Sequence, residues 1–172
     1  GLKVEIAKIK VGPGTDNSND MGPLVTKPHF EKVKAYVDSG VQEGATLVVD
    51  GRGVKVAGHE EGYFLGACLF DHVKPGMKIY QEEIFGPVLV AMTFRTPEEA
   101  VKLANNTRYG LAASIWSEDI NLALDLATQV KAGTVWINST NLFDALDGSF
   151  NGNSDFCQVE LPVHGLKKLE FK

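Results

Sequence analysis

The sequence predicts an α/β protein built around a parallel sheet. Between residues 88 and 138, three short apolar segments alternate with two segments of helical periodicity, in the order β-α-β-α-β. The first of these segments, residues 88–94, has apolar residues on both faces, as buried parallel strands do. Parallel neighbours need a crossover helix between them, and that crossover is almost always right-handed. We therefore expect residues 88–138 to form one parallel sheet covered by helices.

The first part of the chain is expected to begin with helices separated by a loop. Residues 2–10 can complete a helix, and residues 11–20 contain so many turn formers that they predict a loop. A longer helix is expected to begin at Thr26 or Lys27, with a proline in its first turn and apolar residues at helical spacing. We expect Gly44 to end it, because glycine readily adopts the left-handed conformation that closes many helices.

Two extended segments are expected after this helix. Residues 46–49 are apolar and partly β-branched and stand before an Asp-Gly turn, so they predict a buried strand. Residues 51–62 are polar and rich in glycine, which predicts a surface loop or hairpin. Aromatic and aliphatic residues return between residues 63 and 70 and predict a second extended region.

The helix that follows residue 95 carries a full start signal. Thr96 is the expected N-cap, Pro97 suits the first helical position, and Glu99 completes a capping box. Ala100 and Leu103 are spaced to face the sheet. We expect this helix to be the first crossover.

The next elements repeat the pattern once more. Residues 111–116 predict a strand, and Ser117 is expected to cap a helix that Gly133 ends. Residues 134–138 predict a third strand. Beyond residue 141 the periodicity indicates no further element.

Composition and charge narrow the class of protein. The 172 residues are 44% hydrophobic and 23% charged, which are values typical of a globular domain with a core. The net charge of −5, without a basic patch, argues against a nucleic-acid partner. The longest apolar runs are far shorter than the roughly 20 residues that cross a bilayer, so we expect no membrane span, and no signal-peptide pattern opens the chain.

The cysteines and histidines show no pattern of a metal site or a disulfide framework. Cys68 lies among apolar residues and is expected to be a buried structural thiol, and Cys157 has no evident partner. The four histidines have no ligand spacing and are expected to lie at the surface: His29, His59, His72 and His164. We therefore expect no metal, and a reducing compartment, with the cytoplasm as the first choice.

The densest group of chemically useful side chains is Glu82–Pro87, directly before the first regular strand. A carboxylate offers two acceptor oxygens, so Glu82 or Glu83 could accept both hydroxyls of a ribose diol. An aromatic residue such as Phe85 could pack on a flat ring. In the alternative interpretation, the glutamates are solvated and Phe85 belongs to the core. Spacing alone favours this alternative, because most charged residues lie at the surface.

The segment Gln81–Leu89 resembles the E-E-I-F-G-P-V signature of aldehyde dehydrogenases. Further segments resemble motifs of the same family and occur in the family's order: Leu2–Gly14, Met21–Leu24, Glu43–Ala45, Gly62–Phe64, Ala104–Ala113 and Gly133–Asn138. Several ordered matches are far more specific than one. The resemblance covers residues 1–141 and identifies a partial aldehyde dehydrogenase catalytic domain, followed by a divergent tail over residues 142–172.

Different parts of the chain resemble two different branches of the family. Residues 21–85 are similar to methylmalonate-semialdehyde dehydrogenases, and residues 86–145 are similar to broad-specificity bacterial aldehyde dehydrogenases. The resemblance implies an NAD- or NADP-dependent oxidation of an aldehyde to an acid or an acyl-CoA in the full-length parent. It implies that Glu83 binds the nicotinamide-ribose hydroxyls, that Phe85 packs near the nicotinamide, and that Asn138 lies near the substrate entrance.

No residue of this chain matches a catalytic position of the family. The G-Q-x-C context of the nucleophile and the E-L-G-G context of the general base are both absent from these residues. We therefore expect the chain alone to be inactive and to bind no cofactor. We also expect it to self-associate, because segments that normally pack against it are missing. A monodisperse monomer in sedimentation would count against that expectation.

Three functions are compatible with the sequence. The first is a fragment of an aldehyde dehydrogenase, and the second is a non-catalytic remnant that serves as an interaction or scaffold module. The third is a stand-alone nucleotide-binding module that uses Glu83, which an NAD⁺ titration without a signal would eliminate. An in-frame upstream segment encoding E-L-G-G and G-Q-x-C would favour the first over the second. The cytoplasm is the expected compartment, or the mitochondrial matrix if the source is eukaryotic.

Overall fold

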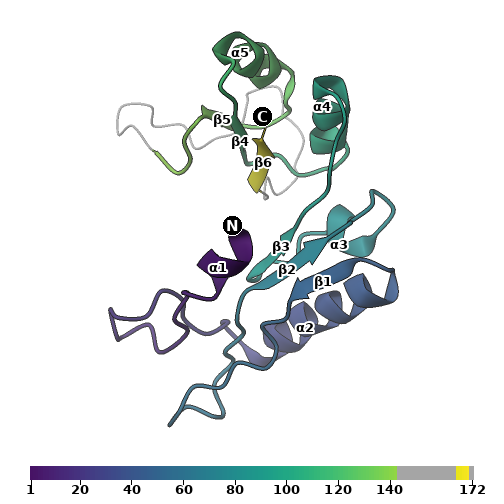
Figure 1. Cartoon of the computed structure of the whole chain (residues 1–172). Helices are drawn as coiled ribbons and strands as arrows, with labels where there is room; N and C mark the ends of the chain where they lie inside the picture. Colours follow the sequence, from purple (N-terminus) through teal and green to yellow (C-terminus); the bar gives the residue numbers. More distant parts are fainter. Residues whose placement is uncertain (143–165, 171–172) are drawn as a thin grey trace. The chain divides into compact units, whose positions relative to one another are not determined.

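The computed structural model describes residues 1–142 and 166–170 (Figure 1). The chain divides into two compact units, Gly1–Thr93 and Phe94–Lys172. In chain order the elements are α1 (Leu2–Ile6), α2 (Lys27–Gln42), β1 (Thr46–Val49), β2 (Cys68–Asp71), α3 (Lys78–Gln81), β3 (Val88–Val90), α4 (Pro97–Asn105), β4 (Ala112–Trp116), α5 (Ile120–Gln129), β5 (Thr134–Ile137) and β6 (Leu166–Glu170).

The first unit contains a sheet in the order β1-β2-β3. β1 runs antiparallel to β2, and β2 runs parallel to β3, with Cys68 opposite Val88. The helix α2 lies alongside this sheet and contacts β1 (Figure 1). Phe70, on the central strand β2, is fully buried, and its neighbours in the core come from α2, α3 and the segments around them.

The helix α2 forms as its sequence predicts. Thr26 is the N-cap, and its side chain accepts a hydrogen bond from the backbone N–H of His29. The proline lies in the first turn, where its missing N–H has no helical partner to lose. Gly44 takes a φ of 89°, the left-handed conformation expected after the helix end. The helix therefore confirms the predicted start and end.

The second unit contains a parallel sheet in the order β5-β4-β6. β4 pairs with β5 and also with β6, and Ala112 lies opposite Thr134 on one side and Leu166 on the other. Residues 112–115 of the central strand are all buried. α5 contacts β4 and β5, and α4 contacts α5. The predicted α/β class with parallel strands is confirmed.

The strand β3 is where the predicted sheet is wrong. β3 covers only Val88–Val90 and pairs with β2 in the first unit, not with β4 or β5. Leu89 is 49% exposed. Apolar residues on both faces indicated a buried inner strand, but among the described residues this strand lies at the edge of its sheet, so one side of it is not covered.

The start of α4 confirms Thr96 as the N-cap, but the predicted capping-box contact of Glu99 is wrong. Thr96 accepts a hydrogen bond from the backbone N–H of Glu99, as expected. The Glu99 carboxylate accepts from the backbone N–H of Arg95 at 2.8 Å, one residue before the position that a capping box requires. An ion pair with the Arg95 guanidinium draws the carboxylate in this direction.

The start of α5 differs from the expectation. Its N-cap is Asp119, which accepts from the backbone N–H groups of Asn121 and Leu122, whereas Ser117 accepts from the N–H of Asp119. Ser117 thus binds the backbone of Asp119, and Asp119 in turn caps the helix, so the helix begins at Ile120, later than Ser117 indicates. It also ends earlier, at Gln129, well before Gly133.

Near the ends of the chain the structure adds two differences. α1 stops at Ile6, before the predicted residue 10. β6 lies beyond residue 141, where no strand was expected, because its Leu-Lys-Lys-Leu-Glu sequence does not alternate. Cys157 and His164 lie outside the described residues.

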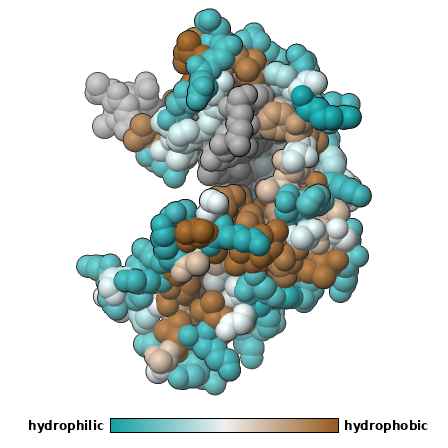
Figure 2. Space-filling model, in the orientation of Figure 1, coloured by the Kyte–Doolittle hydropathy of each residue, from teal (hydrophilic) through white to brown (hydrophobic). Residues whose placement is uncertain are grey.

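Apolar side chains stay exposed on the first unit. Figure 2 shows brown apolar surface gathered on the visible face of this unit. Large hydrophobic residues that are well exposed there include Leu2, Val4, Val25, Phe85 and Leu89. Such surface is typical of a region that another segment or chain covers. No helix among the described residues is both long and apolar enough to cross a bilayer.

Candidate functional site

The turn of residues 82–87, called here the Glu83 turn, joins α3 to β3 in the first unit. Ile84 is buried in the core and anchors the middle of the turn. The carbonyl of Pro87 accepts a hydrogen bond from the backbone N–H of Cys68 at 2.8 Å, so the exit of the turn is tied to β2. The turn is thus fixed at its exit by backbone pairing and at its centre by burial.

Phe85 is held outward on an unusual backbone. Its side chain is 68% exposed, and its φ of 59° lies in the left-handed region. A bulky residue with this conformation is rare and strained, and such residues gather at functional sites. The interpretation of Phe85 as a core residue is therefore wrong, because the backbone presents the ring to the surface.

The two glutamates of the turn have different surroundings. Glu82 accepts a hydrogen bond at 2.6 Å from the hydroxyl of Tyr36, which comes from α2 and is itself buried. Glu83 is half-buried and lies two residues before Phe85 on the same turn. Glu82 therefore contacts α2, whereas Glu83 shares the turn with Phe85.

Asn138 belongs to the second unit, directly after β5. Its φ of 51° is left-handed, which asparagine tolerates better than most residues. Its side-chain oxygen accepts from the N–H of Ser117 and its side-chain N–H donates to the carbonyl of Ser117, each at 2.9 Å. Its backbone N–H donates to Ile115. These bonds tie the ends of β4 and β5 together, and the expected place of Asn138 near a substrate entrance stays a prediction.

Two residues that sequence reasoning did not assign to the site contact the Glu83 turn. His29 Nε2 lies 2.7 Å from the carbonyl oxygen of Phe85, and Tyr36 holds Glu82. The two rings of His29 and Phe85 also meet edge to face, with centroids 6.3 Å apart. The available signal was the spacing of His29, Val33 and Tyr36, which places all three on one face of a helix.

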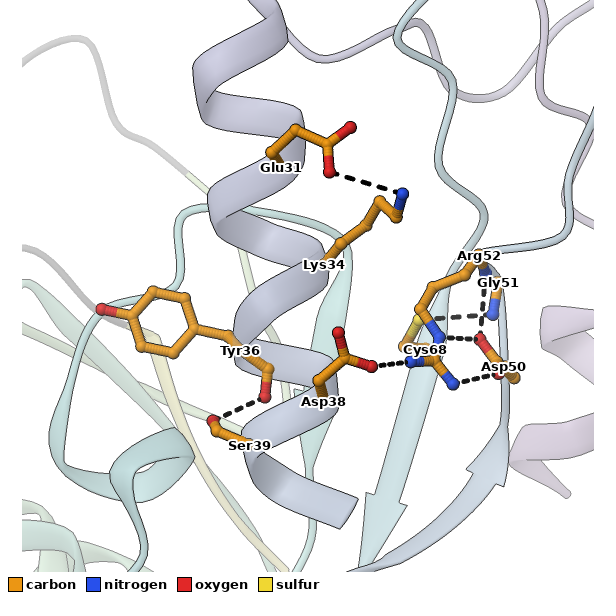
Figure 3. Close-up of polar contacts among 9 residues, drawn as sticks. All are labelled: Glu31, Lys34, Tyr36, Asp38, Ser39, Asp50, Gly51, Arg52 and Cys68. Carbon is orange, nitrogen blue, oxygen red and sulfur yellow. Dashed lines mark hydrogen bonds and ion pairs between the residues drawn. The ribbon is translucent and has the colours of Figure 1, made fainter. Parts of the chain in front are cut away.

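Cys68 has the environment of a structural thiol (Figure 3). It is almost completely buried, and burial raises the pKa of its thiol, which disfavours the reactive thiolate. The backbone N–H of Gly51 donates to its sulfur at 3.3 Å. The prediction that Cys68 is buried is confirmed.

Arg52 fixes the loop beside this thiol. Its guanidinium binds both carboxylate oxygens of Asp50, at 2.6 and 2.8 Å, and also Asp38 on α2 (Figure 3). A bidentate pair of this kind sets geometry as well as charge. Hydrogen bonds from Arg52 hold the pKa of Asp50 below its ordinary value. Within residues 1–142 and 166–170, no three acidic, histidine or cysteine side chains gather as a metal site requires.

Comparison with known proteins places the chain in one family. The model of the aldehyde dehydrogenase family matches residues 1–155. The malonate-semialdehyde dehydrogenase of Pseudomonas aeruginosa is 49% identical over 137 residues, which are 80% of this chain and 28% of that protein. Malonate-semialdehyde dehydrogenase 1 of Oceanobacillus iheyensis is 36% identical over 170 residues, which are 99% of this chain and 35% of that protein.

Solved structures agree with the sequence relatives. A Sinorhizobium meliloti protein described as a methylmalonate-semialdehyde dehydrogenase, in complex with NAD, matches with a TM-score of 0.77 and 44% identity over 80% of this chain and 28% of that one. Betaine aldehyde dehydrogenase of Staphylococcus aureus, in complex with NAD⁺, matches with a TM-score of 0.78 and 39% identity over 84% of this chain and 28% of that one. This chain spans roughly a third or less of the length of these relatives. By sequence and by fold, the chain belongs to the aldehyde dehydrogenase family.

Proposed function

We propose that this chain is part of the catalytic domain of an NAD- or NADP-dependent aldehyde dehydrogenase and that the Glu83 turn contacts the nicotinamide end of the cofactor. One observation carries the proposal: the backbone holds Phe85 outward in a left-handed conformation, two residues from Glu83. Relatives crystallised with NAD support the choice of cofactor. When bound, that cofactor accepts the hydride of the oxidised aldehyde.

The residues of the turn suit the two ends of a nicotinamide riboside. The Glu83 carboxylate has two acceptor oxygens for the two hydroxyls of a ribose. The exposed ring of Phe85 offers a flat apolar face for the nicotinamide. The family resemblance assigns the ribose to Glu83, and Glu82 accepts a hydrogen bond from the hydroxyl of Tyr36.

A chimera tests the assignment of Glu83. Residues 1–141 replace the matching segment of the Sinorhizobium meliloti protein, and NAD⁺ is titrated into the chimera. Glu83→Gln is expected to raise the NAD⁺ dissociation constant about 10-fold or more, because hydrogen bonds to a charged group are worth about 1.5–3 kcal/mol. Glu82→Gln is the matched control: its amide oxygen can still accept from Tyr36, so the constant should stay within about twofold. Equal affinity of the Glu83→Gln and unsubstituted chimeras would refute the assignment.

The whole protein is proposed to oxidise an aldehyde to an acid or an acyl-CoA. The malonate-semialdehyde dehydrogenases among its relatives make semialdehydes the first substrates to test.

The 172-residue chain alone is expected to form no NADH from any aldehyde. It contains no cysteine in a G-Q-x-C context, and its one described cysteine is buried. The measurement is aldehyde-dependent NADH absorbance with purified chain, and sustained turnover would contradict the assignment.

The second candidate is a non-catalytic interaction module. The exposed apolar side chains of the first unit favour it, since they offer a surface for another copy or partner. Self-association is proposed on the same ground. An in-frame upstream coding sequence with E-L-G-G and G-Q-x-C would favour the enzyme over this module.

Two further assignments are proposals: Asn138 lies near the substrate entrance, and residues 142–172 form a divergent tail. The cytoplasm is the proposed compartment, with the mitochondrial matrix as the alternative because one relative is a mitochondrial aldehyde dehydrogenase.

A further inference from the structure

The Glu83 turn is contacted at successive points by one face of α2. His29, Val33 and Tyr36 are spaced by four and three residues, which places them above one another on a helix. His29 reaches the carbonyl of Phe85, and Tyr36 reaches the carboxylate of Glu82. The partners lie 56 and 46 residues away in the sequence. α2 therefore contacts the turn on both sides of Glu83, at Glu82 and at Phe85.

Val33 fills the space between these two contacts. A Cβ atom added at Gly86 would lie only 2.7 Å from Val33 Cγ1, so the backbone of the turn passes directly over this fully buried side chain. The close approach leaves no room for a larger residue at Gly86. The turn therefore packs against α2 at Glu82, Phe85 and Gly86.

The hydrogen bond from His29 stabilises the strained backbone conformation of Phe85. A carbonyl oxygen can only accept, so Nε2 of His29 must carry the proton in this hydrogen bond. The backbone N–H of His29 is in turn bound by the Thr26 side chain, which fixes the first turn of the helix. The bond therefore joins a fixed helix end to the residue whose left-handed backbone is strained.

The contact of Tyr36 holds the entrance of the turn. The ring is buried, and the ammonium groups of Lys32 and Lys78 lie 5.7 and 5.0 Å from its centroid. Lys78 begins α3, the short helix that leads into the turn, and its backbone N–H donates to Glu43 at 2.7 Å. Tyr36 is thus fixed on α2 while its hydroxyl holds Glu82.

We propose that His29 and Tyr36 are positioning residues that hold the Glu83 turn in its cofactor-binding shape before any cofactor arrives. This inference rests on the proposed function of Glu83 and Phe85. Neither residue needs to touch the cofactor. A preformed turn would avoid the loss of binding energy that ordering it on contact would require.

Hydrogen exchange on the 172-residue chain tests the proposal without a cofactor. The backbone N–H groups of Glu82 and Val88 stand at the two ends of the turn, where they donate to the carbonyls of Lys78 in α3 and of Gly86. Their exchange therefore reports opening at the entrance and the exit of the turn. His29→Phe keeps an aromatic ring and removes the donor, and it should speed exchange at these two amides about 5- to 10-fold. His29→Gln restores a donor and should return exchange toward the unsubstituted rate.

His59→Phe is the matched control, because His59 meets Phe64 with the same ring separation of 6.3 Å and a similar angle, in a loop outside the turn. Tyr36→Phe removes one hydroxyl from a ring that stays buried, so it decides the matter if His29→Phe fails to fold. Faster exchange confined to the turn supports the proposal. Unchanged exchange at both amides in a folded variant overturns it, and so does an equal rise throughout α2.

A second readout separates positioning from general stability. In the chimera described above, His29→Phe should raise the NAD⁺ dissociation constant about 3- to 5-fold, yet add little when Glu83 is already glutamine. Fully additive effects would overturn the positioning role. If Glu83→Gln alone leaves affinity unchanged, the proposed function fails, while the exchange result still decides whether α2 shapes the turn.

Discussion

Phe70→Ala is expected to lower the free energy of unfolding of the first unit by about 3–5 kcal/mol. Phe70 is fully buried on the central strand of the sheet and packs in the core cluster with Val33 and Val37 of α2. Truncation removes the buried ring and leaves a cavity that neighbours on a sheet and a helix cannot fill without moving. Native-state hydrogen exchange at the amides of β2 measures the effect.

Phe85→Ala is the matched comparison, because the substitution is chemically identical and only the exposure differs. The ring of Phe85 is 68% exposed, so its loss should change the same free energy by less than about 1 kcal/mol. A large loss at Phe85 would mean that its ring supports the fold. A small loss at Phe70 would place the core of this unit elsewhere.

Asn138→Leu is expected to lower the free energy of unfolding of the second unit by about 2–4 kcal/mol. Leucine has a similar size but cannot make the two bonds to the backbone of Ser117, and it strains at a φ of 51°. Both tryptophans of the chain, Trp116 and Trp136, lie in this unit, so tryptophan fluorescence in urea reports its unfolding selectively.

Asn138→Gly separates the two causes. Glycine accepts the left-handed backbone but also lacks the side-chain bonds, so it should lose about 1–2 kcal/mol, less than leucine. Equal losses for the two variants would show that backbone strain contributes nothing. No loss for either would mean that the bonds to Ser117 do not stabilise the ends of β4 and β5.

Local signals in the sequence were sufficient for the elements that local physics controls. The cap at Thr96 and the left-handed end at Gly44 depend on residues within one turn of them, and the structure confirms both. The choice of partner for β3 is not local. Its apolar residues fit an inner or an edge strand equally well, and only the pairing with β2 decides between them.

The candidate site likewise combines residues that local sequence signals identify with residues that only long-range contacts identify. The composition of residues 82–87 marks the turn as chemically unusual, and the family resemblance singles out Glu83 and Phe85. His29 and Tyr36 could not be found in this way, because their contacts join residues 56 and 46 positions apart. A histidine at the start of a helix has many possible partners, and only the fold selects the carbonyl of Phe85.

A crystal structure of the chimera with NAD⁺ bound tests the central claim most directly. The claim predicts that the Glu83 carboxylate oxygens lie about 2.5–2.7 Å from the hydroxyl oxygens of the nicotinamide ribose, as in other charge-assisted hydrogen bonds, with the ring of Phe85 beside the nicotinamide. A ribose bound entirely by other residues, with Glu83 directed away from it, would contradict the claim.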